Sequence, residues 1–189
     1  MRNMLVAAAA VIAFASSANA AEYKVDPEHT YPSFVADHMG LDHWRGKFNS
    51  TSGTIQLDRE KGEGTVDLTI DPASIDYGLD KLNDWAKGPE LFDVAKYPTA
   101  TYKGKLVGFR DGVPSRVEGE LTLHGVTRPV PLDIVMFKCV PHPVFKRELC
   151  GAEAKATIQR DDFGLDVGKE YGIKMDVGLE IQVEAIAVK

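Results

Sequence analysis

The sequence KMDVGLEIQVEAIAV at residues 174–188 decides the fold. Apolar residues occupy every second position from 175 to 187, and mostly charged, polar or small residues fall between them. Side chains alternate between two faces with this period in a β-strand, whereas an α-helix would scatter the same residues around its circumference. The stretch therefore predicts a long strand with one face on an apolar core and the other in water.

Shorter stretches with the same alternation recur through the chain. They lie near residues 34–38, 54–58, 65–71, 99–109, 116–123, 130–136 and 152–158, and turn sequences such as GEG at 62–64 and DG at 111–112 separate several of them. In the stretch at 130–136, the expected inward residues are Val130, Leu132, Ile134 and Met136. Seven or eight strands at this spacing predict an antiparallel barrel or sandwich.

One segment interrupts the strand pattern. Between residues 72 and 98 the apolar period changes from two towards three or four, which is typical of a helix. The Gly-Pro pair at 88–89 ends this helix. Its apolar face consists of Leu79, Leu82, Trp85 and Ala86. The chain is therefore expected to be all-β with a short helical insert.

Small inward residues favour a hollow barrel over a filled one. In the stretch at 152–158, Ala152, Ala154 and Ala156 present mainly methyl groups to the interior. A barrel of eight strands is wide enough to hold one small ligand. A barrel with a filled core also uses alanine where it narrows, so a solid core stays open as the alternative. A bilayer-spanning barrel is disfavoured, because most stretches are shorter than the roughly 9–11 residues that each of its strands needs.

The inward positions of the predicted strands supply the candidate cavity-lining residues. These are Phe34, Ala36, Leu68, Ile70, Leu121, Ile134, Ala154, Ala156, Val177 and Leu179. Trp44 follows a histidine-containing segment and Trp85 lies on the predicted helix, so either can cover a cavity mouth. We assign both to the entrance together with His38, and burial in the core stays open for each tryptophan.

The N-terminal residues have the pattern of a cleavable signal peptide. A positive start at Arg2, an apolar run at 4–14 and an A-x-A signal at 18–20 predict a signal peptide at 1–20 and one domain at 21–189. Export leads to an oxidising compartment, where Cys139 and Cys150 are expected to pair, with two buried free thiols as the alternative. No later segment contains about 18 consecutive apolar residues, so no integral membrane segment is predicted. The net charge of -6, without a basic cluster, argues against nucleic acid or an anionic membrane surface as partner.

No catalytic motif stands out. The sequence has no G-x-S-x-G elbow, Walker-type loop or H-E-x-x-H, so neither a catalytic residue nor a cofactor is predicted. His29, His38 and His43 are the best metal candidates, but their spacings of nine and five residues place neighbours on opposite faces of a strand unless a turn at Gly40 brings them together. We expect these histidines to cap turns or form hydrogen bonds near the barrel mouth, and no metal is predicted.

Five short strings, in order across the mature chain, resemble one family of exported proteins. They are YKVDPEHT at 23–30, GKF at 46–48 with GTI at 53–55, FDVAKYP at 92–98, LTLHGVT at 121–127 and RDDFG at 160–164. Together they resemble the YceI-like family of lipid-binding proteins. The resemblance implies a lipocalin-like, eight-stranded antiparallel barrel in the bacterial periplasm, with a helix near one end and a long apolar cavity for a polyisoprenoid or similar lipid. It also implies that a homodimer can form, and it brings no catalytic residues.

The chain departs from the family pattern just before the FDV string. Many members carry Arg-Asp-x-His-Leu where this chain has LNDWA at 82–86, so we expect a more apolar cover over the cavity. The predicted function is that of a periplasmic carrier of a long apolar lipid, such as a polyisoprenoid, a quinone or a fatty acyl derivative. The alternatives are an enzyme that uses His29 or His38 on an isoprenoid or oxidised lipid, and a structural protein whose cavity is collapsed.

Overall fold

A computed structural model of the chain describes residues 20–189. The signal peptide expected at 1–20 thus lies, apart from its last residue, outside the described residues. The strands are β1 (Ala21–Val25), β2 (Tyr31–His38), β3 (Asp42–Phe48), β4 (Thr51–Asp58), β5 (Glu63–Ile70), β6 (Ile75–Asp76), β7 (Ala100–Val107), β8 (Arg116–Leu123), β9 (Val126–Pro129), β10 (Leu132–Pro141), β11 (Glu148–Gln159) and β12 (Asp176–Ala187). The helical elements are α1 (Asp80–Lys87) and the 3-10 turns η1 (Pro72–Ser74), η2 (Arg160–Phe163) and η3 (Lys169–Tyr171).

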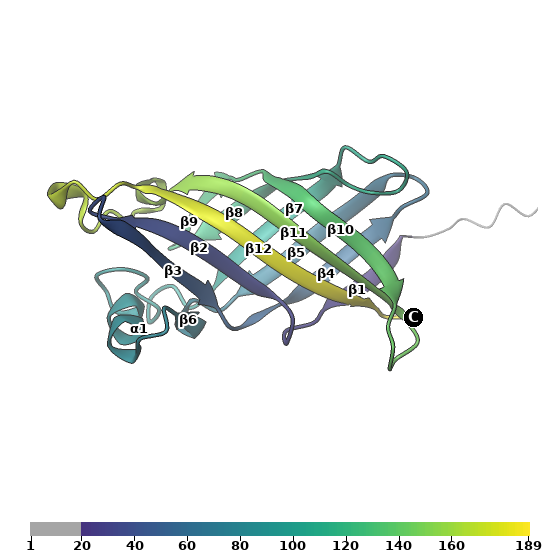
Figure 1. Cartoon of the computed structure of the whole chain (residues 1–189), viewed down its shortest axis with the longest axis horizontal. Helices are drawn as coiled ribbons and strands as arrows, with labels where there is room; N and C mark the ends of the chain where they lie inside the picture. The colour runs from purple at the N-terminus through teal and green to yellow at the C-terminus, as the bar shows by residue number, and fades with distance from the viewer. Residues whose placement is uncertain (1–19) are drawn as a thin grey trace, which may run out of the picture.

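The strands close into a barrel. Every pairing is antiparallel, the order runs β1-β4-β5-β7-β8-β10-β11-β12, and β12 pairs back with β1. β1 and β2 lie end to end along β12, which pairs with β1 at 185–187 and with β2 at 177–182. β3 and β4 continue one another in the same way, since β3 pairs with β2 and β4 with β1. The eight-stranded antiparallel barrel with a short helix is therefore confirmed (Figure 1).

The last strand, β12, is paired along both of its edges. β12 pairs with β11 over residues 176–186, and its other edge carries β1 and β2. Val177, Ala185 and Ala187 are buried, as the alternation predicts. Because a register slip of one residue would turn this apolar face outward, the register of three neighbouring strands depends on it.

The two ends of the barrel differ. α1, β6 and the loop that carries η3 lie at one end, and the β10–β11 hairpin and the C-terminus lie at the other (Figure 1). α1 ends where the Gly88 amide donates to the Trp85 carbonyl. Ala86, near the end of this helix, is fully buried. Among residues 20–189, no helix has the length and apolar composition needed to cross a bilayer.

β10 departs from the predicted register. A bulge between Ile134 and Met136 shifts its pairing with β11, and one extra residue reverses the faces of the strand beyond it. Met136 is therefore 53% exposed, and Phe137 packs against the core instead. The inward assignment of Met136 was wrong because positions 135–137 are all apolar, so the alternation cannot locate the bulge.

The two cysteines form the predicted disulfide. Cys139 on β10 and Cys150 on β11 lie directly opposite each other in the register, with Cα atoms 4.0 Å apart. The β10–β11 hairpin that this bond closes lies at the end of the barrel away from α1 (Figure 1). The disulfide thus joins neighbours that the sheet already pairs.

Candidate functional site

The end of the barrel that carries α1 contains a cavity of about 410 Å³. Its lining comes from β2, β3, β5, β7, β8, β10, β11 and β12, from α1 and the segments on either side of it, from Val130 before β10, and from the loops around η2 and η3. Trp85 and Tyr171 line the cavity and are 37% and 73% exposed, so the cavity reaches solvent at this end. Its volume falls within the range of about 300–1,000 Å³ that is usual for small-molecule sites.

Aromatic side chains build one wall. The Tyr77 ring is edge-on to Phe34, with ring centroids 5.4 Å apart, and to Trp44, with centroids 6.3 Å apart. Phe48 and Phe92 are also edge-on, with centroids 5.6 Å apart. Edge-to-face contacts fix ring orientation, because the positive edge of one ring faces the negative face of the next. This wall is therefore preformed without a ligand.

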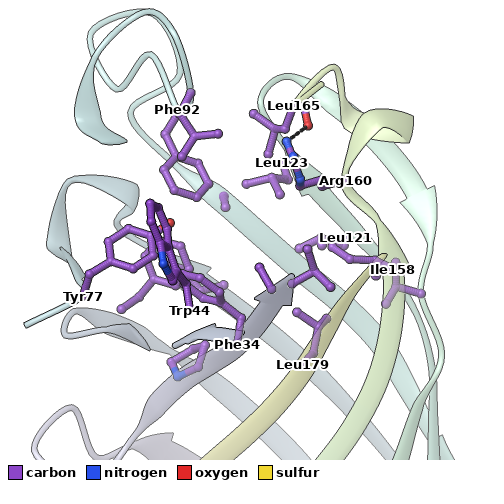
Figure 2. A pocket seen from close by; sticks show the side chains of 18 of the residues that line it. Phe34, Trp44, Tyr77, Phe92, Leu121, Leu123, Ile158, Arg160, Leu165 and Leu179 are labelled. Atoms are coloured by element: carbon purple, nitrogen blue, oxygen red, sulfur yellow. Dashed lines mark hydrogen bonds between the residues drawn. The ribbon is translucent and has the colours of Figure 1, made fainter. Parts of the chain in front are cut away.

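Aliphatic side chains form the facing wall. Leu121 and Leu123 from β8 and Ile158 from β11 lie across the cavity from Phe34 and Trp44 (Figure 2). Leu179 from β12 lies beside Phe34 in the strand register. When an apolar ligand replaces water at such a surface, the apolar area of both partners is removed from water, which is favourable. The cavity thus suits a ligand whose main recognition element is hydrocarbon.

Arg160 is the cationic side chain of this lining. It begins η2 and donates from Nη1 to the Leu165 carbonyl at 2.5 Å (Figure 2). Its Nη2 donates to the Val167 carbonyl at 2.7 Å. Burial lowers the pKa of Arg160, and Tyr77, Asp161 and Asp166 oppose that shift. Burial also raises the pKa of Tyr77 to about 12, against the influence of Arg160. The guanidinium and the phenol therefore share one poorly hydrated space.

A second, smaller space of about 80 Å³ continues along the barrel axis. Leu68, Tyr102, Leu132 and Ile181 line both spaces, so these four side chains lie between them. The Tyr102 hydroxyl donates to the Val130 carbonyl at 2.8 Å, which fixes this ring in the buried interior. The larger cavity therefore narrows at a defined constriction.

Comparison with known proteins assigns the barrel to a family. The sequence matches the YceI-like domain over residues 23–185. The chain belongs to the YceI-like family. It is 34% identical to a UPF0312 protein of Pectobacterium atrosepticum over 187 residues, which cover 96% of this chain and 95% of that protein. It is also 32% identical to Protein YceI of Escherichia coli over 180 residues, which cover 93% and 92% of the two chains.

Solved structures share the fold. The YCEI protein of Campylobacter jejuni superposes with a TM-score of 0.68 at 24% identity, covering 80% of this chain and 90% of that one. A polyisoprenoid binding domain from Saccharophagus degradans, implicated in plant cell wall breakdown, superposes with a TM-score of 0.63 at 22% identity, covering 89% and 99%. At these identities the likeness concerns the fold of the YceI-like barrel alone.

The structure distributes the predicted lining residues along the YceI-like barrel. The large cavity is lined by Phe34, Ala36, His38, Trp44, Leu68, Ile70, Trp85, Leu121, Val177 and Leu179. Ile134 and Ala154 line the small space instead, and Leu68 lines both. Ala156 lines neither space and packs against the core.

Several lining residues of the YceI-like barrel come from irregular segments and were not predicted. Tyr77 lies between β6 and α1, Phe92 in the loop after α1, and Leu165 after η2. Phe92 and Arg160 each stand in a string that carries the family resemblance, and that was the one available signal for them. Tyr77 has no such signal, because periodicity identifies faces only within regular elements.

The three candidate metal-ligating histidines of the YceI-like barrel occupy two places. His38 stacks on Trp44 at 4.2 Å beside the cavity, and His43 lies on the neighbouring strand β3. His29 lies in the turn between β1 and β2 and lines neither space. In residues 20–189, no group of close metal-ligating side chains contains two of these histidines.

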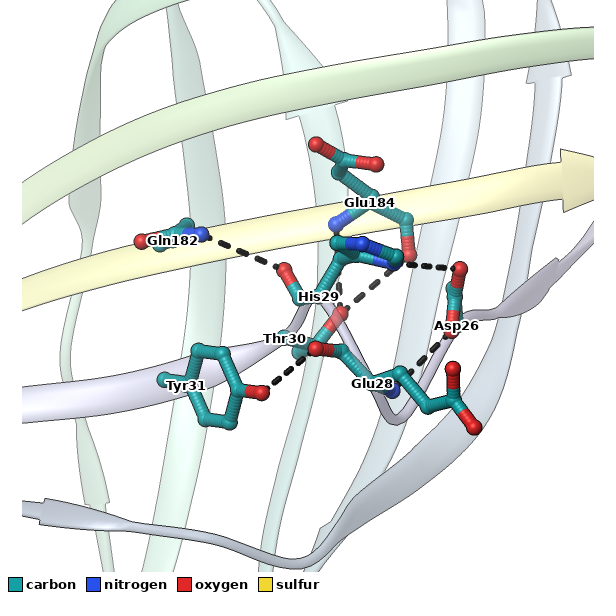
Figure 3. A network of polar contacts seen from close by, with 7 residues as sticks. All are labelled: Asp26, Glu28, His29, Thr30, Tyr31, Gln182 and Glu184. Atoms are coloured by element: carbon teal, nitrogen blue, oxygen red, sulfur yellow. Dashed lines mark hydrogen bonds and ion pairs between the residues drawn. The ribbon is translucent and has the colours of Figure 1, made fainter. Parts of the chain in front are cut away.

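His29 belongs to a polar network on the outside of the barrel. Its Nδ1 lies 2.8 Å from a carboxylate oxygen of Asp26, and Glu184 on β12 lies within 4.8 Å of both side chains (Figure 3). Burial alone would raise the pKa of Asp26, but the hydrogen bond with His29 leaves it lowered. The same bond raises the pKa of His29. The network ties the break between β1 and β2 to β12, where the Thr30 hydroxyl also donates to the Glu184 carbonyl.

Proposed function

We propose that this protein binds a long apolar lipid in the 410 Å³ cavity and carries it through the periplasm. The observation that carries the proposal is the preformed, almost wholly apolar lining of a cavity that opens beside Trp85 and Tyr171. The shared fold of the polyisoprenoid binding domain from Saccharophagus degradans supports the same class of ligand. A polyisoprenoid, a quinone or a fatty acyl derivative would each fill such a space.

Hydrocarbon burial supplies the affinity in this proposal. Each methylene removed from water contributes about 0.8 kcal/mol, which corresponds to about a fourfold change in the dissociation constant. A tail that runs from the mouth to the constriction at Leu68 and Tyr102 would gain this increment along its whole length. Binding therefore needs few polar contacts, and cavity length would select the cargo.

The expected signal peptide and the Cys139–Cys150 bond support a place in the periplasm, since disulfides persist in oxidising compartments. The cavity reaches solvent at one end of the barrel, so cargo would enter and leave there. Carriage, in which lipid is held and released unchanged, accounts for these features without a catalytic group.

Native mass spectrometry of protein taken directly from the periplasm tests the proposal. We expect a co-purifying apolar mass that organic extraction removes and that returns when the protein is incubated with lipid. A bare polypeptide mass in several gentle preparations would contradict carriage. Conversion of the added lipid to a new mass would instead indicate an enzyme.

A further inference from the structure

The charge of Arg160 is not balanced inside the cavity. Among residues 20–189, no carboxylate makes an ion pair with its guanidinium. Asp161 pairs with Lys169 at 2.6 Å, and Asp161 and Asp166 both act on Arg160 without forming an ion pair with it. A cation set among apolar walls without a counter-ion is unfavourable, because it has lost part of its hydration.

The loop contacts of Arg160 do not use its full hydrogen-bonding capacity. A guanidinium carries five N–H donors, and the Leu165 and Val167 carbonyls accept two bonds. Both bonds go to neutral carbonyls, so they hold the loop without neutralising the charge. Donors therefore remain for an acceptor that arrives with a ligand.

Tyr77 adds a second donor from the aromatic wall. Its ring is fixed by Phe34 and Trp44, and its hydroxyl has no hydrogen-bond partner in the part of the chain that the structure describes. Tyr77 and Arg160 line the same cavity, and each lies near enough to influence the pKa of the other. A cationic group and a neutral donor thus face one apolar space from two sides.

The acidic residue of the lining is already engaged. Asp37 accepts hydrogen bonds from the backbone amides of Gly40 at 3.1 Å and Lys174 at 3.4 Å. Its carboxylate therefore holds the β2–β3 hairpin to the segment before β12. Arg160 is left as the side chain of the cavity that is suited to attract a charged ligand group.

We propose that the cargo is an amphiphile with an anionic oxygen group, a carboxylate or a phosphate, which Arg160 binds with Tyr77 as a second donor. This inference rests on the proposed lipid-binding function and adds the class of head group. Arginine matches both anions, because its planar fork can donate two parallel bonds to their oxygens. The tail would extend from Arg160 towards the constriction at Tyr102.

Three ligands with the same tail test this inference: dodecyl phosphate, dodecanoate and 1-dodecanol. Trp44 and Trp85 are the two tryptophans of the chain and both line the cavity, so their fluorescence reports binding. For the wild-type protein we expect dissociation constants for the two anions at least tenfold below that for the alcohol. The relative affinity of phosphate and carboxylate identifies which of the two sources the site prefers.

Variants assign the preference to Arg160. Arg160→Met should bring the anion-to-alcohol ratio close to one and change the affinity for the alcohol less than threefold. Arg160→Lys, which keeps the charge but not the fork, should retain part of the ratio, and Tyr77→Phe should lower it severalfold. Lys169→Met is the matched control, because it removes an exposed charge from the same loop outside the cavity and should preserve the ratio.

The outcomes separate the two proposals. If the wild-type protein binds all three ligands equally, or if Arg160→Met keeps the preference for anions, the head-group inference is wrong while the lipid-binding proposal stands. If none of the three binds, both proposals fail. A collapse of the ratio in Lys169→Met as well would show a general field of the loop and not a contact of Arg160.

Discussion

Gly46→Ala uses the backbone to narrow the cavity. Gly46 on β3 lies opposite Phe34 on β2, and the Cζ end of the Phe34 ring lies next to the glycine. A Cβ atom at position 46 would lie 2.5 Å from Cζ of Phe34 and 2.9 Å from Cε1. Carbon atoms pack at about 3.5–4.0 Å, so the ring must move by about 1 Å. Phe34 lines the cavity, so the space available to the ring is the space proposed for the lipid.

The structure sets the size of both effects. Overpacking costs about 1–3 kcal/mol, and the adjacent open space places this case near the lower end. Replacing glycine by alanine offsets up to about 1 kcal/mol by restricting the unfolded chain. We therefore expect the free energy of unfolding to fall by no more than about 1 kcal/mol, which corresponds to a fall in Tm of no more than about 4 °C. Loss of room for one or two methylenes should weaken dodecanoate binding about fourfold to fifteenfold.

Thermal unfolding and a fluorescence titration with dodecanoate measure the two effects on the same samples. Gly178→Ala on β12 is the matched control, because its Cβ would meet the Val35 carbonyl oxygen at 3.8 Å, an ordinary contact. The control should keep wild-type affinity. Unchanged affinity in Gly46→Ala together with lowered stability would refute the reasoning, since the moved ring would then not border the bound tail.

Three further predictions concern the tail, the disulfide and pH. In a series of fatty acids, affinity should rise about fourfold per methylene and then level off when the tail fills the cavity, and no dependence on length would contradict apolar binding. The double change Cys139→Ser and Cys150→Ser should lower the free energy of unfolding by about 3 kcal/mol in chemical denaturation. Its dodecanoate affinity should stay within about twofold of wild type, because the bond lies away from the large cavity, and a larger loss would contradict this placement. Folding raises the pKa of His29 above 6.5, so its contribution to stability is complete below that pH and is lost as pH rises through the folded-state value. His29→Ala should therefore lower Tm more near about pH 5.5 than near about pH 9, and an equal effect at both values would rule out the Asp26 pairing as the cause.

The regular strands were predictable because an apolar face constrains their register. The alternation located β8 at its observed bounds, Arg116–Leu123, and assigned the faces of β12. It failed on β10, where the apolar run at 134–137 conceals the bulge before Met136. A period of two tells which face a residue occupies and cannot detect an extra residue in an apolar run.

The sequence predicted which residues of the candidate site point into the barrel, but not how far along the barrel axis each one lies. Ala154 and Ala156 both alternate correctly, yet Ala154 lines the small space and Ala156 lines neither. Height along the barrel axis depends on strand tilt and stagger, which the sequence of one strand does not contain. Tyr77 and Arg160 were missed for another reason. Tyr77 lies in the segment between β6 and α1 and Arg160 begins η2, and in such segments the direction of side chains does not repeat with a period.

Glycines explain why bulky aromatic residues leave the barrel hollow. The Phe34 ring occupies the space that a side chain at Gly46 on the next strand would need. Tyr102 on β7 lies against Gly119 on β8, where an added Cβ would sit 2.5 Å from the tyrosine oxygen. The missing side chains give the rings room beside the wall, where they cover the backbone of the neighbouring strand. The open volume therefore depends on pairs of large and absent side chains in adjacent strands, and a Cβ at either glycine would push a ring towards the axis.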